Sequence, residues 1–405
     1  MRLFCTVVCA VLLTAIAPAD WLSTEPDGGR LDAGCISPHD PEVIYVAPYS
    51  PGAYSRVHRS TDGGATWETV GTLPYTYTPY NLMVDPWHDS LVYATGSGNR
   101  FLRSTDHGET WSYVTTPIYM YYAAIDPAIP GRIYVVGYNS TTPRHPSFTR
   151  SDDRGLTWSP MTIIDSTVEN QYAYSVAADS GYLFVGASHA GLYRSTDAGL
   201  TWAFANAGIT PTTAQTKAFR IDPDDKNVVL AAASGGVFRT TNAGDTWVKT
   251  GSLLGYYMGF STADPDIGYA GYNYVYRTTD RGLTWSRPNP GLHMRYLKGF
   301  GAHPTDSDLV YAWGSAGVRK STDAGLAWTR SDVGLRVSTI NSLSINPSDP
   351  SRIYLDMDDC GMYYSLDGGA AWDTCRYFLA CGGICDIGVI PGADADILYA
   401  LEGSG

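Results

Sequence analysis

Short apolar runs alternate with turn-forming clusters of Gly, Pro and Asp along most of the chain. One stretch shows the order plainly: residues 81–84, 91–95 and 100–103 form three such runs, and a fourth begins at Trp111. An Asp-Pro turn separates the first two runs. Short runs bounded by turn residues are typical of β-strands joined in hairpins. The pattern therefore predicts an all-β chain of consecutive antiparallel strands.

An eight-residue motif, Ser/Thr-x-Asp/Asn-x-Gly-x-Thr/Ala-Trp, recurs between the third and fourth strands of these units. Its tryptophans stand at positions 67, 111, 158, 202, 247, 285, 328 and 372. The intervals run from 38 residues (Trp247 to Trp285) to 47 residues (Trp111 to Trp158). A period of this size matches one four-stranded blade of a β-propeller. We therefore predict a single β-propeller of four-stranded antiparallel blades, with one motif in each of eight blades.

The motif itself has a structural explanation. Its acidic or amide side chain can accept hydrogen bonds from backbone N–H groups of its own turn, and its glycine permits a positive φ angle. The tryptophan then begins the fourth strand. The eight acceptors, which we interpret as structural, are Asp62, Asp106, Asp153, Asp197, Asn242, Asp280, Asp323 and Asp367. The residue before the motif is usually Arg, which we expect to be a structural neighbour of the turn.

The two ends of the repeat array leave the closure of the ring open. Trp21 is in phase with the motif tryptophans, so residues 21–24 are expected to form a lone fourth strand. Residues 387–390 and 397–401 are expected to be the first two strands of a ninth repeat. Joining the ends gives a ring with a partial ninth blade. In the alternatives, seven blades close first and the rest begins a second propeller, or the chain is a fragment of a longer protein.

The N-terminus is typical of a secretory signal. Arg2 precedes an apolar run over residues 3–16, and Ala17-Pro18-Ala19 offers a small-residue cleavage site. We therefore divide the chain into a signal peptide, residues 1–19, and the propeller, residues 20–405. The expected location is secreted, or the periplasm or cell envelope. No later segment is predicted to enter a membrane.

Composition excludes some classes of partner. The formal net charge is −13, and 17% of the residues are charged. No basic patch is available to neutralise phosphates, which disfavours nucleic acid. The scattered histidines lack metal-ligand spacing, and we predict neither a metal nor a cofactor. The expected state is a monomer.

The cysteines that remain after signal cleavage are unevenly placed. Four of the five, Cys360, Cys375, Cys381 and Cys385, lie in the C-terminal repeats, and Cys35 stands alone. Disulfides are the default in an exported protein. We expect Cys360 to pair with Cys375 and Cys381 with Cys385. Zinc binding is the weaker alternative, because the spacing lacks paired C-x2-C knuckles.

The eight motifs resemble the Asp-box, or BNR, repeats of sialidases, sortilin-type receptors, xyloglucan-cleaving glycosidases and photosystem II assembly factors. The resemblance covers residues 20–405 and implies the propeller fold. It also implies that the boxes lie on the face away from the usual ligand site. Fold does not determine activity, so the boxes are no evidence of a catalytic site.

The catalytic members of that superfamily carry motifs that this chain lacks. No Arg-Ile-Pro element of the sialidases occurs, because Arg132-Ile133 and Arg352-Ile353 are each followed by Tyr. The acidic segment of the xyloglucan-cleaving enzymes is missing from residues 47–59. We therefore assign no catalytic residue. Glycosidase chemistry would need two facing carboxylates, for which the candidates are Asp356, Asp358 and Asp359, with Glu169 or Glu402 opposite.

Tyrosines are concentrated in the connections expected on the face opposite the boxes. Tyrosine combines a flat apolar ring with a polar tip, which suits sugars, peptides and protein surfaces. The candidate ligand-binding residues are Tyr77, Tyr80, Tyr121, Tyr122, Tyr174, Tyr256, Tyr257, Tyr296 and Trp313. The resulting hypothesis is a secreted, non-catalytic propeller that binds or scaffolds a glycan or protein ligand. The alternative is a glycoside hydrolase of the sialidase-like or xyloglucanase-like type.

Overall fold

The computed structural model describes most of residues 31–402. The residues outside the described part are 1–30, 49–54, 75–76, 189–190, 210–214, 234, 254–255, 262, 291, 293, 295–296, 315–316, 332–339, 347–348, 350, 358–360, 369–371, 375–383, 391–396 and 403–405. The expected signal peptide, the strand at residues 21–24 and three of the paired cysteines therefore lie outside it. Cys385 lies in a strand, and Cys35 is a free thiol.

Every regular element in the described residues is a β-strand, and four consecutive strands usually form one sheet. Blade 1 comprises β1 (Leu31–Ile36), β2 (Ile44–Pro48), β3 (Arg56–Ser60) and β4 (Glu68–Thr72). Blade 2 comprises β5 (Pro79–Asp85), β6 (His88–Gly96), β7 (Arg100–Ser104) and β8 (Ser112–Thr115). Blade 3 comprises β9 (Tyr119–Ile125), β10 (Ile133–Tyr138), β11 (Pro146–Ser151) and β12 (Thr162–Ile163). Blade 4 comprises β13 (Ala173–Asp179), β14 (Tyr182–Ala187), β15 (Gly191–Ser195) and β16 (Ala203–Phe204).

The pattern continues through the second half of the ring. Blade 5 comprises β17 (Thr216–Ile221), β18 (Val229–Ala233), β19 (Gly236–Thr240) and β20 (Val248–Gly251). Blade 6 comprises β21 (Tyr257–Phe260), β22 (Gly268–Gly271) and β23 (Val275–Thr278), and a bridge between Arg277 and Ser286 stands in for its fourth strand. Blade 7 comprises β24 (Leu297–Ala302), β25 (Val310–Gly314), β26 (Gly317–Ser321) and β27 (Thr329–Arg330). The short interval between Trp247 and Trp285 thus belongs to the reduced sixth blade.

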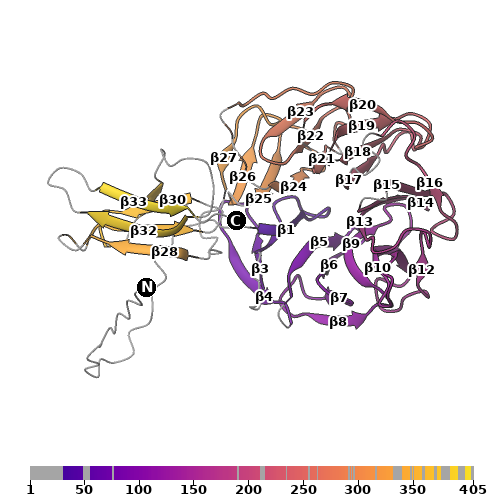
Figure 1. Ribbon diagram of the computed structural model, residues 1–405, viewed down its shortest axis with the longest axis horizontal. Helices are drawn as coiled ribbons and strands as arrows, with labels where there is room; N and C mark the ends of the chain where they lie inside the picture. The colour runs from indigo at the N-terminus through magenta and orange to yellow at the C-terminus, as the bar shows by residue number, and fades with distance from the viewer. Residues whose placement is uncertain are drawn as a thin grey trace, which may run out of the picture.

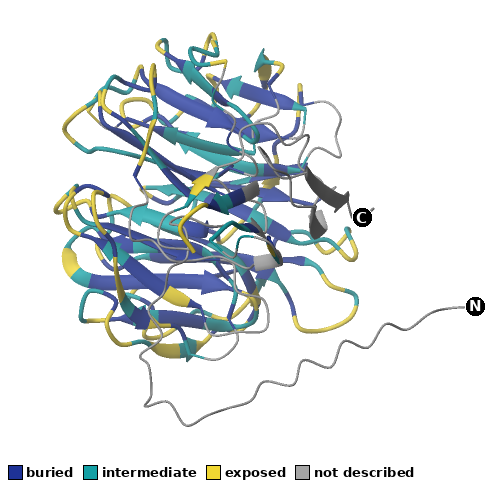
Figure 2. Cartoon of the chain, turned by 90° about the vertical axis from the view of Figure 1, so that its left-hand side faces the viewer, coloured by how far each residue is buried: buried dark blue, intermediate teal, exposed yellow. Residues whose placement is uncertain are grey.

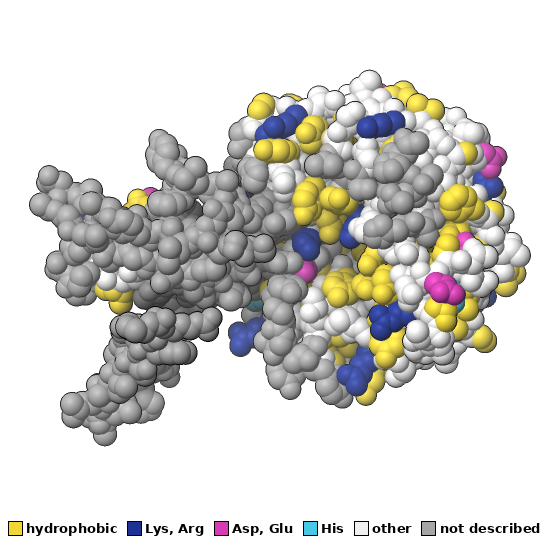
Figure 3. Space-filling view, viewed as in Figure 1, with side chains coloured by type: hydrophobic (Ala, Val, Ile, Leu, Met, Phe, Trp, Pro, Cys, Tyr) yellow, Lys and Arg dark blue, Asp and Glu magenta, His cyan; other side chains and the backbone are white. Residues whose placement is uncertain are grey.

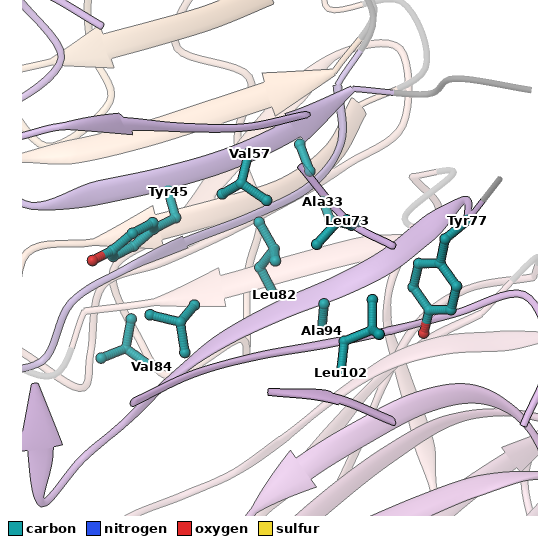
Figure 4. Packing of buried hydrophobic residues seen from close by; sticks show 11 residues of the cluster. Ala33, Tyr45, Val57, Leu73, Tyr77, Leu82, Val84, Ala94 and Leu102 are labelled. Atoms are coloured by element: carbon teal, nitrogen blue, oxygen red, sulfur yellow. The ribbon is translucent and has the colours of Figure 1, made fainter. Parts of the chain in front are cut away.

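All neighbouring strands within a blade are antiparallel, and the first strand of each blade lies innermost (Figure 1). The apolar core is divided among the interfaces between blades. One such layer joins Tyr45 and Val57 of blade 1 to Leu82 and Leu102 of blade 2 (Figure 4). Figure 2 shows the same organisation, with buried strands inside the blades and exposed turns at their ends. This arrangement explains the short apolar runs of the sequence, because each sheet is covered on both faces by its neighbours.

The ring closes between blade 7 and blade 1. Strand β1 packs against β24, and a shared apolar layer includes Ile44 and Trp67 from blade 1 with Tyr311 from blade 7. The Trp67 indole N–H donates to the Ser331 carbonyl at 2.9 Å, and the Tyr311 hydroxyl donates to the Gly63 carbonyl at 2.9 Å. The prediction of an all-β propeller of four-stranded antiparallel blades is confirmed, but its closure as one ring with a partial ninth blade is not. Seven blades bury both apolar edges, and this was the alternative closure.

The chain beyond the ring begins another set of blades. Strands β28 (Ile340–Ile345), β29 (Ile353–Met357), β30 (Gly361–Ser365) and β31 (Asp373–Thr374) form a four-stranded sheet. Strands β32 (Ile384–Ile390) and β33 (Ile397–Glu402) form a hairpin, and β32 packs beside β28. Figure 1 shows these strands outside the seven-bladed ring. The first strands of two successive blades are thus neighbours here, as they are within the ring.

Candidate functional site

The Asp-box turns satisfy their own hydrogen bonds. In the third box, Asp153 accepts the Ser151 hydroxyl at 2.7 Å, the Thr157 backbone N–H at 2.8 Å and the Thr157 hydroxyl at 2.5 Å. The second box repeats this set around Asp106, where the Thr110 hydroxyl, above all, lowers the pKa of the carboxyl to about 2. These oxygens are occupied by the turn itself.

The boxes also join neighbouring blades. Arg154 and Gly155 are both left-handed, at φ 61° and 80°, and a Cβ on Gly155 would lie 2.5 Å from a ring carbon of Phe101 in blade 2. The box glycine must therefore lack a side chain because it rests on the preceding blade. Likewise, Arg150 donates to the Ala198 carbonyl in the next box, at 3.2 Å. At the closure Lys320 donates to the Gly63 carbonyl at 3.0 Å in the same way.

A cavity of about 310 Å³ lies inside the ring of inner strands. Its lining residues come from all seven blades: Asp32, Tyr80, Tyr121, Tyr122, Tyr174, Lys217, Tyr257 and Lys298. A second cavity of about 270 Å³ shares six of these residues and continues along β1 and β24. In the view of Figure 3, basic and hydrophobic side chains gather at the middle of the ring.

A β-bulge places most of these side chains. In six inner strands the pairing register shifts near the strand start, and the residue that the ladder skips is Asp32, Tyr80, Tyr121, Tyr174, Lys217 or Lys298. An extra residue in one strand is left unpaired and its side chain is re-aimed. The residue after the bulge links the blades instead: Asn81 donates to the Ala123 carbonyl and Ser175 to the Thr216 carbonyl, at 2.9 and 2.7 Å.

The position of the bulge also identifies the face of the ring. Each inner strand begins at the connection from the previous blade and ends at the turn on the box side. The bulge lies near the beginning, so the cavity is nearer the face opposite the boxes. This is the face on which the sequence placed the tyrosine-rich connections.

The charged groups of the cavity lie on one side of it. Lys298 forms an ion pair with Asp32 at 3.1 Å across the closure between blades 7 and 1. The Lys217 ammonium lies 4.9 Å from the centre of the Tyr174 ring. Burial, with a smaller contribution from Lys298, lowers the pKa of Lys217. In the described part of the chain, no carboxylate lies within ion-pair distance of Lys217.

A tyrosine cluster occupies the opposite side, on blades 2 to 4. Tyr121 is its centre, with ring centroids 4.6 Å from Tyr174 and 5.8 Å from both Tyr80 and Tyr138. Burial and these neighbouring hydroxyls raise the pKa of Tyr121. Arg144 caps the cluster, 4.9 Å over the Tyr138 ring. The tyrosines are therefore neutral, closely packed platforms whose rings are fixed by one another.

Five of the nine aromatic candidates line the cavity: Tyr80, Tyr121, Tyr122, Tyr174 and Tyr257. Tyr77 is instead 3% exposed and donates to the Arg100 carbonyl. Trp313 is 5% exposed beneath Gly34 and Gly299, and it lines the second cavity. Tyr256 packs edge-on against Tyr272 at 4.8 Å. Tyr296 lies outside the described residues.

Sequence reasoning missed the charged members of the lining, Asp32, Lys217 and Lys298. Aligning the first residues of the inner strands offers a signal, because the six bulge residues all fall within the first three positions of their strands. The missing information was the register shift, which turns these positions into the cavity.

The carboxylate candidates do not face each other across one channel. Asp356 lies in β29 and Glu402 ends β33, both beyond the ring, whereas Glu169 is exposed within it. The expected opposition of Asp356 and Glu169 required a single larger ring, and the closure of blade 7 on blade 1 removes it. Asp358 and Asp359 lie outside the described residues.

Neither a metal centre nor a membrane span appears in the part of the chain that the structure describes. No three His, Cys, Asp or Glu residues there are grouped as metal ligands. The same part contains no helix long and apolar enough to cross a membrane.

A family model, the BNR/Asp-box repeat, matches residues 102–113, which hold the second box. No curated protein sequence matches the chain significantly. Among solved structures, the GH74 xyloglucanase from Xanthomonas campestris is similar, with a TM-score of 0.66 at 15% identity, over 91% of this chain and 71% of the enzyme. An ancestral GH74 enzyme gives a TM-score of 0.71 at 16% identity, over 96% of this chain and 60% of its own.

YCF48 from Cyanidioschyzon merolae is also similar, with a TM-score of 0.54 at 19% identity, over 73% of this chain and 96% of YCF48. The likeness to the GH74 proteins extends past the ring into the strands beyond blade 7, because it covers more of the chain than the ring occupies. At such identities these matches show the fold alone.

Proposed function

Because the chain is a β-propeller built on Asp-box repeats, we propose that it is a binding module whose ligand site is the cavity inside the seven-bladed ring. One observation carries the proposal: six inner strands each aim a bulged side chain into the same space. Bulges are common next to functional sites, where they re-aim a side chain. The cavity size and the mixture of aromatic and charged groups also fit a small-ligand site.

The chemistry of the lining favours binding over hydrolysis. A glycosidase needs two carboxyl groups on either side of the scissile bond. Asp32 is the one carboxylate among the described lining residues, and it is 8% exposed and paired with Lys298. Among the described lining residues, a second carboxylate to face Asp32 across a scissile bond is missing.

The proposal is tested by ligand capture with a matched pair of variants. Tyr121→Ala removes the centre of the tyrosine cluster, whereas Tyr113→Ala removes an exposed tyrosine on the outer strand β8. On a glycan array and in pull-downs, Tyr121→Ala should lose ligands that Tyr113→Ala retains. Equal retention by both variants would contradict a site in the cavity, and hydrolysis of a bound polysaccharide would contradict a non-catalytic module.

A glycoside hydrolase is the second candidate, supported by the fold likeness to GH74 proteins beyond the ring. Its remaining acidic candidate in a described strand of that region is Asp356 in β29. If the purified protein cleaves a polysaccharide, Asp356→Asn should abolish the cleavage. Undiminished cleavage by that variant would remove Asp356 from the mechanism.

We also propose that the protein is exported, on the basis of residues 1–19. Expression with the complete N-terminus should yield a mature protein that begins at Asp20. N-terminal sequencing of the extracellular or periplasmic fraction measures this directly, and an intact Met1 in the mature protein would contradict it.

A further inference from the structure

The cavity has two chemically different walls. Tyr80, Tyr121 and Tyr174 form an aromatic wall on blades 2 to 4, and Lys217 and Lys298 form a cationic wall on blades 5 and 7. The two walls meet where the Lys217 ammonium lies 4.9 Å from the Tyr174 ring centre. A ligand at this junction would touch a flat apolar surface and a positive charge within the span of one small ring.

The two lysines differ in whether a carboxylate of the protein neutralises them. Asp32 already neutralises Lys298 at 3.1 Å. Lys217 is half-buried and, among the described groups, has a ring face but no carboxylate beside it. Burial and the nearby Lys298 make its charged form less favourable. A bound anion would offset both effects, because an opposite charge within hydrogen-bond distance favours the charged form.

We propose that the cavity binds a sugar ring that carries a single carboxylate, a uronic acid, with the carboxylate on Lys217 and the ring against Tyr174 and Tyr121. This inference rests on the proposed binding function and names its ligand class. The shared chemistry is the uronate ring, which is presented either as the free monosaccharide or as the end of an oligosaccharide.

The volume of the cavity and the net charge of the protein limit the number of acidic sugar rings that the site can bind. A volume of about 310 Å³ is at the small end of ligand pockets, so it holds one or two sugar rings. The chain carries a net charge of −13, which repels a long polyanion. One acidic ring at the unpaired lysine is therefore favoured over an extended acidic chain.

The lining favours a sugar over a peptide. Its polar atoms are mainly tyrosine hydroxyls spread around the cavity, and each hydroxyl both donates and accepts. A sugar ring offers many hydroxyl partners to such a perimeter together with a C–H face for the rings. A peptide end would bring a carboxylate to Lys217 but would lack the flat C–H face that a sugar ring places against Tyr174 and Tyr121.

Calorimetric titration of the full chain with glucuronate and with glucose tests the proposal, because the two differ only at the carboxylate-bearing carbon. Glucuronate should bind at least about tenfold more tightly, and 0.5 M salt should remove most of that preference. Lys217→Met should weaken glucuronate binding by at least about tenfold, whereas Lys217→Arg should retain it. Lys249→Met, on the outer strand β20, is the matched control and should bind like the parent protein.

The other outcomes distinguish a failure of the uronate assignment from a failure of the proposed binding function. Equal affinity for glucose and glucuronate, or unchanged affinity in Lys217→Met, overturns the uronate assignment while the binding module stands. Capture of a carboxylate-ended peptide in place of either sugar does the same. If neither sugar nor peptide binds, the inference and the proposed function both fail. A glucuronate trimer that binds more tightly than the monomer through Lys217 supports the oligosaccharide end as the source, and equal binding supports the monosaccharide.

Discussion

The box turns and the cavity residues occupy equivalent positions in successive blades, yet they vary in opposite ways. In the boxes the same side chains make the same contacts, from Ser60 with Asp62 in blade 1 to Ser321 with Asp323 in blade 7. At the bulge of the inner strand the residue changes from Asp to Tyr to Lys while the backbone device is retained. A position where the same side chain recurs in every blade stabilises the blade. A position where only the backbone geometry recurs can carry different side chains, and these can contact a ligand.

The largest effect should come from a box glycine that rests on the preceding blade. Gly199 has φ 88°, and a Cβ there would lie 2.3 Å from Phe148. Gly199→Ala should lower the free energy of unfolding by about 3–5 kcal/mol, because it adds overpacking to backbone strain. Gly98→Ala is the control, since Gly98 also has a positive φ but no atom within 4 Å of the new Cβ. Its cost should be about 1 kcal/mol.

Urea denaturation followed by tryptophan fluorescence compares these two variants. Equal midpoints would show that the contact with blade 3 contributes nothing beyond backbone strain, and the box would then be a local turn only.

As the pH falls, protonation of a buried histidine in blade 1 should destabilise the protein before the box carboxylates are protonated. Burial, and to a lesser degree Arg56, lowers the pKa of His58 to about 4, from about 6.5 in the unfolded chain. The neutral imidazole therefore stabilises the fold fully above pH 6.5, and this contribution is lost as the pH falls from 6.5 towards 4. The loss amounts to at most about 3.5 kcal/mol, because one pKa unit corresponds to about 1.4 kcal/mol.

The boxes titrate lower, since the pKa of Asp106 is about 2. Unfolding measured between pH 7 and pH 4 should therefore become flatter in His58→Gln and stay unchanged in shape in Asp106→Asn. A slope that persists in His58→Gln would locate the acid sensitivity in another group.

Much of the fold followed from the sequence because it repeats. The period, the strand order within a blade and the box turns all depend on local patterns such as Ser151 to Trp158. The closure did not follow, because it depends on which apolar edges meet: Trp67 is in phase with Trp21 by sequence but donates to Ser331 in the structure. Five of the eight lining residues of the cavity could be predicted, because they are tyrosines in the connections singled out by the sequence. Lys217 and Lys298 were not, because a register shift of one residue decides which side chain enters the cavity.

A smaller loss should follow from removing one box carboxylate. Asp153→Ala leaves the Thr157 backbone N–H and the Ser151 hydroxyl without their acceptor in an exposed turn. The expected cost is about 1–2 kcal/mol, as for the loss of a capping side chain. Asp153→Asn should cost less than half as much, because the fifth box already uses Asn242 with its amide donating to Thr246 at 2.9 Å. Thermal melting of both variants measures the difference, and an equal cost would assign the effect to the charge.

The smallest effect on stability should come from a substitution in the cavity lining, in contrast to the substitutions in the boxes. Lys217→Met keeps an unbranched apolar chain beside Tyr174 and removes a charge whose burial is unfavourable in the folded protein, as its lowered pKa shows. The lost cation–π contact and the relieved desolvation oppose each other, so the free energy of unfolding should change by less than about 1 kcal/mol. The melting temperature without ligand measures this. A strong destabilisation would make Lys217 a structural residue like Asp153, whereas an unchanged melting temperature shows that the ring folds without this charge and leaves the lysine available to a ligand.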